Sequence, residues 1–276
     1  MPLWQALILG IVQGATEFLP VSSSGHLQVI PWLFGWADLE AHPDLERAFD
    51  VALHLGTFVG AAAYFRTDIA RLSKAGLAAV AKRRIETEDE RTAILLGLSA
   101  IPAAGLGAAL DAMLDGDFIS EGVIGLLLIV FGLLLWLSDR STADRPASSW
   151  RTRDALVMGT AQAMALFPGV SRSGATITSA RFSGLSRDAA TRLSFLMALP
   201  VTAGAIAYEG VKLIRAGGIP PGFGGAFGVG IGAAAVTGFG AVWGLLRFVR
   251  NRSFAPFVVY RVLAGAVIIA VAAARA

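Results

Sequence analysis

The stretch QGATEFLPVSSSGHL (residues 13–27) places Pro20 and several polar residues in the middle of an apolar segment. A second stretch, PGVSRSGAT (168–176), does the same in the other half of the chain. Backbone groups in lipid must be hydrogen-bonded, so an irregular polar turn at membrane depth is tolerated only where protein or a water-filled cavity surrounds it. We therefore predict two re-entrant helix hairpins, at about 3–36 and about 154–185.

The composition is that of a membrane protein. Of the 276 residues, 55% are hydrophobic and 16% are charged, whereas an average soluble domain has roughly 25% charged residues. The chain has no cysteine, which excludes disulfides and thiolate metal sites. Its Lys and Arg residues form short clusters between apolar runs, which is typical of topology signals. We expect a lipid bilayer around the protein and no nucleic-acid partner.

Six further apolar segments meet or approach the length of a membrane span, because a bilayer core about 30 Å thick needs about 20 helical residues. They are 49–65, 93–110, 119–138, 193–209, 225–246 and 254–274. The predicted fold class is all-α: a polytopic membrane protein with six transmembrane helices and two re-entrant helix hairpins, in a single membrane domain covering 1–276.

The charges predict the two sides. Basic residues gather in segments 66–91, 139–153 and 247–252, which the positive-inside rule assigns to the cytoplasm. The acidic loops 38–46 and 111–121 should face outward, and His42 in the first loop should lie at the surface.

An odd number of crossings in each half inverts the second half relative to the first. This gives repeat one at about 1–138 and repeat two at about 150–276. Aligning Gln13 with Gln162 supports the repeat, because QGATEFLPVSSSGH and QAMALFPGVSRSGA match at six of fourteen positions. Inverted repeats with broken helices commonly place their functional site near the midplane, where the breaks meet.

The first break gathers residues that could carry chemistry. Ionisable groups inside apolar segments are costly unless they are paired or line water. The polar residues here are Gln13, Glu17, Ser22, Ser23, Ser24 and His26. They could orient or deprotonate a hydroxyl nucleophile, or supply an imidazole as nucleophile or general acid. Alternatively, the serines cap the second half-helix and Glu17 is a snorkelling end residue.

The second break resembles a phosphate cradle in its chemistry. Glycines let the backbone approach a ligand, free N–H groups at a helix start attract an anion, and arginine binds phosphate bidentately. The candidate residues are Ser171, Arg172, Ser173 and Thr176. Alternatively, Arg172 pairs with Glu17 across the repeat interface, which is compatible with anion binding. The combined site suits a phosphorylated amphiphile whose tail lies between helices.

Two further patterns carry weaker predictions. Asp50 and His54 stand one turn apart at the outer start of span 49–65, and could reach the site or bind a metal with Glu17; a solvated helix end is the alternative. Three GxxxG pairs predict close helix packing. They are Gly10/Gly14, Gly56/Gly60 and Gly240/Gly244.

At these residues the sequence resembles the bacterial undecaprenyl-diphosphate phosphatase family associated with bacitracin resistance. Residues 13–27 follow the family form [E/Q]-x-x-x-E and then PVSS-x-GH, and residues 168–176 follow PG-x-SRS-x-x-T. The resemblance implies a multi-pass phosphatase of the bacterial plasma (inner) membrane, with an inverted-repeat fold that can form a homodimer. Such an enzyme hydrolyses undecaprenyl diphosphate at the periplasmic or outer face, and so recycles the lipid carrier for peptidoglycan and cell-wall synthesis.

The resemblance also implies roles for individual residues. Catalytic roles fall on Glu17, Ser23, His26 and Arg172, and substrate-binding roles on Gln13, Ser22, Ser24, Ser171, Ser173 and Thr176. In this mechanism Glu17 orients or deprotonates Ser23 or a water, and His26 is the alternative nucleophile or the acid at the leaving phosphate. A divalent cation, Mg²⁺ or Ca²⁺, is implied as cofactor with Glu17 as a ligand. Gln13 stands where the family more commonly has Glu, so that site has one carboxylate fewer.

A transporter is the competing function. Inverted repeats and broken helices are the architecture of secondary transporters. The same site could carry a prenyl phosphate lipid across the membrane, alone or in addition to hydrolysis.

Overall fold

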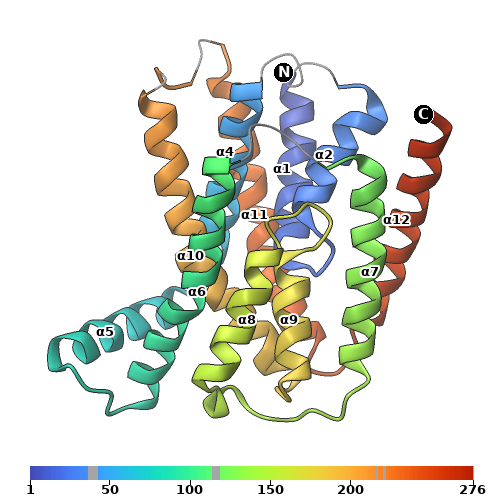
Figure 1. Cartoon of the computed structure of the whole chain (residues 1–276). Coiled ribbons are helices and arrows are strands. Elements are labelled where there is room, and N and C mark those ends of the chain that lie inside the picture. Colours follow the sequence, from blue (N-terminus) through green and yellow to red (C-terminus); the bar gives the residue numbers. More distant parts are fainter. Residues whose placement is uncertain (37–42, 114–118, 216, 220–221, 276) are drawn as a thin grey trace.

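The computed structural model describes residues 1–36, 43–113, 119–215, 217–219 and 222–275, and these ranges are largely helical (Figure 1). The predicted all-α class is confirmed. Each predicted hairpin consists of two helices. The first pair is α1 (Leu3–Phe18) and α2 (Ser23–Phe34), and the second is α8 (Thr152–Met164) and α9 (Arg172–Phe182).

Both helix breaks lie where the proline-containing motifs predict them. α1 ends at Phe18, since the residue before a proline disfavours the helical conformation. The residues that precede α2 and α9 are Ser22 and Ser171, with φ of 73° and 72°. This left-handed region is strained for a residue that has a Cβ atom. The two breaks therefore share an unusual local backbone as well as a sequence pattern.

Within the described residues, five helices are long and apolar enough to cross a membrane. They are α6 (Glu88–Met113), α7 (Glu121–Asp139), α10 (Arg187–Arg215), α11 (Gly224–Phe248) and α12 (Ala255–Arg275). They match five of the six predicted spans. The remaining span, 49–65, lies in α4 (Pro43–Tyr64), which qualifies only together with α5 (Arg66–Lys82) across a bend of 85°. The structure thus has five candidate spans, or six if this bent pair is one span.

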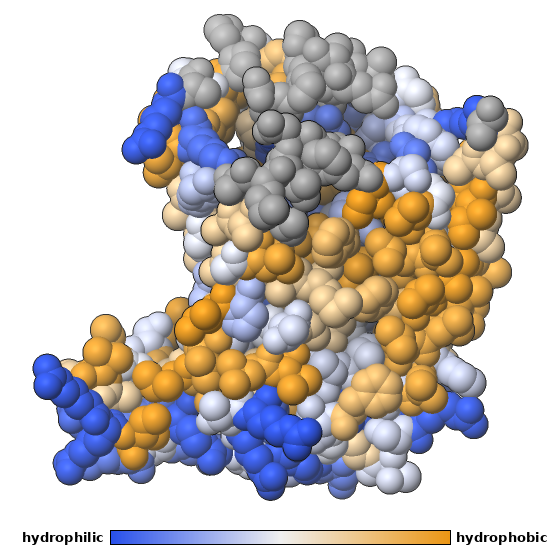
Figure 2. Space-filling model, in the orientation of Figure 1, coloured by the Kyte–Doolittle hydropathy of each residue, from blue (hydrophilic) through white to orange (hydrophobic). Residues whose placement is uncertain are grey.

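The bend and the surface chemistry mark one end of the molecule. Figure 1 shows α5 leaving the bundle sideways, and Figure 2 shows hydrophilic residues gathered at that end below a broad apolar surface. This polar end carries the basic segments that are predicted to be cytoplasmic. The predicted acidic loops fall largely on 37–42 and 114–118, and they and His42 lie outside the described residues.

Glycine-rich faces hold several helices together. A Cβ at Gly10 would lie 2.6 Å from the Gly230 carbonyl oxygen, and one at Gly14 would lie equally close to the Ala234 oxygen. Gly56 and Gly60 on α4 meet the backbone of α11 in the same way. The close packing predicted for these two GxxxG pairs is confirmed.

The prediction for Gly240/Gly244 is wrong, because nothing within the described residues lies within 4 Å of a Cβ at either position. The small residues that are buried on α11 instead include Gly230, Ala234 and Gly238, whose face lies about a quarter turn around the helix from the predicted pair. The pattern identified small residues but not which face is covered.

α10 is the most buried of these candidate spans. In its most apolar window 61% of the residues are buried, compared with 22% in α6 and in α12. It packs against α4, α6 and α9. α10 thus faces both the long helices and the second break, and it forms a wall of the space between the two breaks.

Candidate active site

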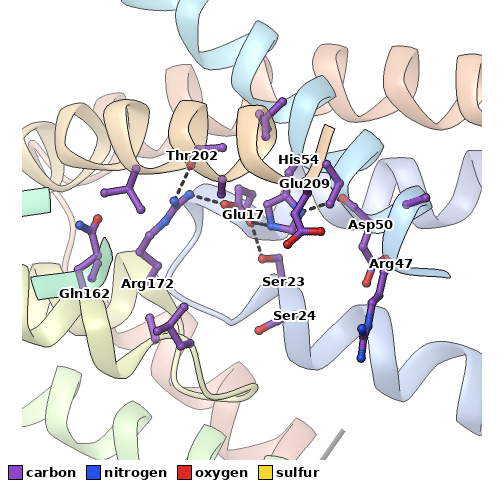
Figure 3. Close-up of a pocket in the computed structure, with 18 of the residues that line it drawn as sticks. Glu17, Ser23, Ser24, Arg47, Asp50, His54, Gln162, Arg172, Thr202 and Glu209 are labelled. Carbon is purple, nitrogen blue, oxygen red and sulfur yellow. Dashed lines mark hydrogen bonds and ion pairs between the residues drawn. The ribbon is translucent and has the colours of Figure 1, made fainter. Parts of the chain in front are cut away.

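A cavity of about 690 Å³ lies between the two helix breaks, α4 and α10 (Figure 3). The first break contributes Glu17, Ser23 and Ser24 to its lining, and the second contributes Ser171 and Arg172. The two breaks therefore meet at one polar site, as the repeat predicted.

Glu17 is the centre of the hydrogen-bond network. It occupies the last turn of α1 and is 7% exposed. One carboxylate oxygen, Oε1, accepts from Nη2 of Arg172. The other, Oε2, accepts from Ser23 Oγ at 2.5 Å and from Gln13 Nε2 at 3.0 Å. The shared helix face of Gln13 and Glu17 and the pairing of Glu17 with Arg172 are both confirmed.

Arg172 links three elements around the cavity. It is the first residue of α9. Its guanidinium forms an ion pair with Glu17 of α1 and donates from Nη1 to Thr202 Oγ1 of α10 at 2.6 Å. Charge-assisted bonds from a planar guanidinium fix its orientation as well as its position. Arg172 is thus held ready for an anion in the cavity.

His54 reaches the site from α4. Its Nδ1 lies 2.8 Å from the Asp50 carbonyl oxygen, which can only accept, so Nδ1 carries a hydrogen. The other nitrogen, Nε2, lies 3.7 Å from Glu17 Oε2. Both Asp50 and His54 line the cavity. Of the alternatives for this pair, reaching the site is the one that the structure bears out.

His26 lies apart from this cluster. Its Nδ1 is 2.6 Å from the Ser22 carbonyl oxygen, and its Nε2 is 2.6 Å from the hydroxyl of Tyr260 on α12. The two rings are stacked with centroids 5.6 Å apart. His26 is not among the residues that line the cavity, and its role at the phosphate stays a prediction.

Several predicted substrate-binding residues hold the turns together instead of facing the cavity. Ser22 Oγ accepts from the Gly169 N–H at 3.0 Å, and Ser173 Oγ donates to the Leu19 carbonyl at 3.0 Å. Both bonds join one break to the other. Thr176 donates to the Arg172 carbonyl at 2.8 Å. Ser24 and Ser171 are the predicted binding serines that line the cavity.

The cavity also has residues that the sequence did not assign to it. They are Arg47, Gln162, Thr202, Glu209 and Lys212. Gln162 was visible as the repeat partner of Gln13, and Arg47 is the first basic residue after an acidic loop. Thr202 gave no signal in the sequence.

Gln162 is the most informative of these residues. It is 2% exposed, and neither its Oε1 nor its Nε2 has a hydrogen-bond partner. Buried polar groups are nearly always hydrogen-bonded. Gln13 bonds to Glu17 four residues later, but the position four residues after Gln162 is Leu166. Within the described residues, the donor and the acceptor of this amide are therefore both unsatisfied at a position in the cavity wall.

The cavity is amphiphilic. In Figure 3, Gln162 and Arg172 lie to one side of Glu17, and Arg47, Asp50 and Glu209 lie to the other. The remaining wall is apolar and comes from α4, α6, α10 and the two residues that follow α8. Its residues are Ala48, Val51, Ala103, Ala165, Leu166, Val201, Ala205, Ile206 and Leu213.

The side chains around Glu17 do not form a divalent-cation site in this arrangement. Mg²⁺ and Ca²⁺ need several oxygen ligands, commonly carboxylates. Within the described residues no group of three His, Asp or Glu side chains is placed to hold a metal ion, and both oxygens of Glu17 already accept hydrogen bonds. The divalent cation stays a prediction, and no group of described side chains is placed to bind it.

Known proteins similar to this chain match it over nearly its whole length. Residues 6–267 match the family described as bacitracin resistance protein BacA. The chain is 45% identical to the undecaprenyl-diphosphatase of Pelobacter propionicus, over 98% of this chain and 97% of the relative. It is 44% identical to that of Thermomicrobium roseum, over 98% of each chain, and 42% identical to that of Geobacter sulfurreducens, over 100% of each.

Proposed function

Because the chain belongs to the family of bacitracin resistance protein BacA, we propose that its cavity hydrolyses undecaprenyl diphosphate to undecaprenyl phosphate and inorganic phosphate. One observation carries the proposal: Arg172, Glu17 and Ser23 form a connected cluster on a cavity that is polar around them and apolar elsewhere. An arginine for the phosphates, a carboxylate for the proton and a hydroxyl for attack are the groups that phosphoryl transfer needs.

The shape of the cavity supports a lipid diphosphate as substrate. The diphosphate fits the end that holds Arg172 and the unpartnered amide of Gln162. The first part of the prenyl chain fits the apolar wall formed by α4, α6, α10 and the residues that follow α8. A C55 chain is far larger than the cavity, so most of it extends between helices into the bilayer.

Ser23 is the nucleophile in the mechanism that the geometry favours. Its Oγ attacks the terminal phosphorus while its proton passes to Glu17 Oε2, the atom to which it already donates. The bond from that phosphorus to the bridging oxygen breaks, and undecaprenyl phosphate leaves with its charge held by Arg172. Glu17 then releases this proton to solvent, takes one from the water that attacks the phosphoserine, and returns it to the Ser23 oxygen as inorganic phosphate leaves.

The positions of the charged residues that line the cavity support an active site at the outer face. The charged residues Arg47 and Asp50 lie near the start of α4, and Glu209 and Lys212 near the end of α10. Both of these helix ends are at the opposite end of the bundle from α5 and the basic surface (Figure 1). With the basic surface in the cytoplasm, the substrate enters from the outer leaflet and the enzyme recycles the lipid carrier there.

The test is hydrolysis by the purified protein. We expect inorganic phosphate and undecaprenyl phosphate to form in equal amounts from undecaprenyl diphosphate in detergent, measured by a phosphate assay and mass spectrometry. Reconstituted vesicles distinguish hydrolysis from the competing function, which is transport. Movement of intact lipid diphosphate across the bilayer without phosphate release would instead support a transporter.

A further inference from the structure

Arg261 is a buried charge that the mechanism above does not use. It lies in the first third of α12 and is 0% exposed. A charge inside a membrane span is costly unless it is paired or otherwise satisfied. None of the ion pairs in the described part of the chain includes Arg261. Its hydrogen bonds go to backbone carbonyl oxygens.

Those carbonyls belong to both helix breaks. Nη2 of Arg261 donates to Gly169 O at 2.9 Å and to Val170 O at 3.1 Å, both in the second break. Nη1 donates to Pro20 O in the first break at 3.1 Å, and Nε donates to Leu128 O of α7 at 2.9 Å. A single guanidinium thus ties the two turns to each other and to the neighbouring helix.

A glycine of the second motif makes room for this guanidinium. A Cβ at Gly174 would lie 2.8 Å from Nη1 of Arg261, closer than such atoms pack. On α7, a Cβ at Gly132 would lie 3.2 Å from the Cβ of Arg261. Gly174 in PGVSRSGAT is therefore explained by Arg261, which stands more than 80 residues later in the chain.

A carbonyl that Arg261 contacts belongs to a residue adjacent in the chain to one that lines the cavity. The Val170 carbonyl shares its peptide unit with the N–H of Ser171, a cavity residue. Hydrogen bonds polarise one another along a chain, so a cation at that carbonyl makes this N–H a stronger donor. The positive charge also acts through a region of low dielectric, where its attraction for an anion is larger than in water.

We propose that Arg261 is a positioning residue of the phosphate site. It sets the separation of the two turns that carry Ser23 and Arg172, and its fixed positive charge favours the diphosphate. The proposal refines the hydrolase function of the same cavity and rests on it. Binding of inorganic diphosphate, which requires no turnover, distinguishes a failure of this proposal from a failure of the hydrolase assignment.

The test compares Arg261→Lys, Arg261→Gln and Gly174→Ala with the wild type by calorimetric binding of inorganic diphosphate and by kcat and KM for the lipid substrate. Lysine keeps the charge but lacks the planar fork. We expect Arg261→Lys to bind diphosphate about tenfold more weakly, with a matching rise in KM. Arg261→Gln should bind more weakly still, and Gly174→Ala should resemble Arg261→Lys because it displaces the guanidinium.

Arg181 provides the matched control. It is 2% exposed and donates to the carbonyls of Ala143, Leu185 and Ser141, at the basic end of the bundle. Arg181→Lys should lower the melting temperature without changing diphosphate affinity. If Arg261→Gln does not fold, Arg261→Lys and Gly174→Ala still decide the question. Wild-type diphosphate affinity in both of these variants would overturn the proposal and leave Arg261 as a purely structural residue.

Discussion

Ser23 and Ser24 are adjacent hydroxyls on the same cavity, and the structure distinguishes them. Both line the cavity, but Ser23 donates to Glu17 at 2.5 Å, whereas Ser24 lies 3.5 Å from Ser22 Oγ. A serine is a weak nucleophile unless a base activates it. This difference supports the proposal that Ser23 makes the attack.

The serine assignment predicts unequal effects of two alanine substitutions. Ser23→Ala should lower kcat by more than about a hundredfold, and Ser24→Ala should stay close to the wild type. A rapid acid quench with labelled substrate should trap phosphoserine at position 23. A water nucleophile would instead leave Ser23→Ala partly active with no trapped phosphoserine.

Substitution of Gln162 should weaken substrate binding without lowering the melting temperature. Leucine at this position removes two unsatisfied buried polar atoms, so the melting temperature should stay equal or rise. The KM for undecaprenyl diphosphate should increase about tenfold, which corresponds to one lost hydrogen bond. Thr178 is also buried with an unpartnered side-chain oxygen but does not line the cavity, so Thr178→Val should leave KM unchanged. An unchanged KM in Gln162→Leu would remove the amide from the substrate site.

The contacts of Arg261 could not be predicted from the sequence. It is the sole charged residue within the predicted span 254–274, and an intramembrane charge is a functional signal. Its partners are backbone carbonyls from two distant breaks, and no side-chain pattern records such partners. By contrast, Glu17 and Arg172 were identifiable because each lies inside a polar motif, and their contact follows once the two motifs are related as repeats.

At the level of elements, α11 is the helix on which α1 and α4 pack. Both α1 and α4 contact it, and their glycines bring the backbones within van der Waals distance. The Cβ that alanine would add at Gly14 meets Thr237 Oγ1 and the Ala234 carbonyl. Glu17 stands one turn beyond Gly14, so this packing also places the carboxylate.

We therefore expect Gly14→Ala to destabilise the fold by about 1–3 kcal/mol through overpacking, with a lower melting temperature in detergent and reduced hydrolysis. Gly244→Ala is the control on the same kind of motif, because nothing described lies near its added Cβ. Equal melting temperatures for the two variants would contradict the packing of α1 on α11.

The elements themselves were largely predictable. Prolines and glycines located both breaks, and apolar length located the long helices. The sharp turn between α4 and α5 was not predicted, because segment 66–91 showed its basic charge but not its helical direction. Phe65 is fully buried at this turn, and only tertiary packing determines such a bend. The choice of packed face on α11 was wrong for the same reason.

For the whole molecule, the fold and its charges predict one orientation in the membrane. The chain has no cysteine, so single cysteines report topology without background. Lys74→Cys on α5 should react with an impermeant maleimide only after right-side-out vesicles are permeabilised. Ile219→Cys, between α10 and α11, should react in intact vesicles. The opposite pattern would place the cavity mouth and the substrate entrance in the cytoplasm.

Glu17 and Arg172 come from different breaks, form one ion pair and line the cavity. The most direct measurement of the central claim is phosphate release from undecaprenyl diphosphate by purified wild type, Glu17→Gln and Arg172→Ala, each shown to be folded. We predict release by the wild type and a loss of at least about a hundredfold in each variant. Near-normal release by either folded variant, or no release by the wild type, would contradict the account.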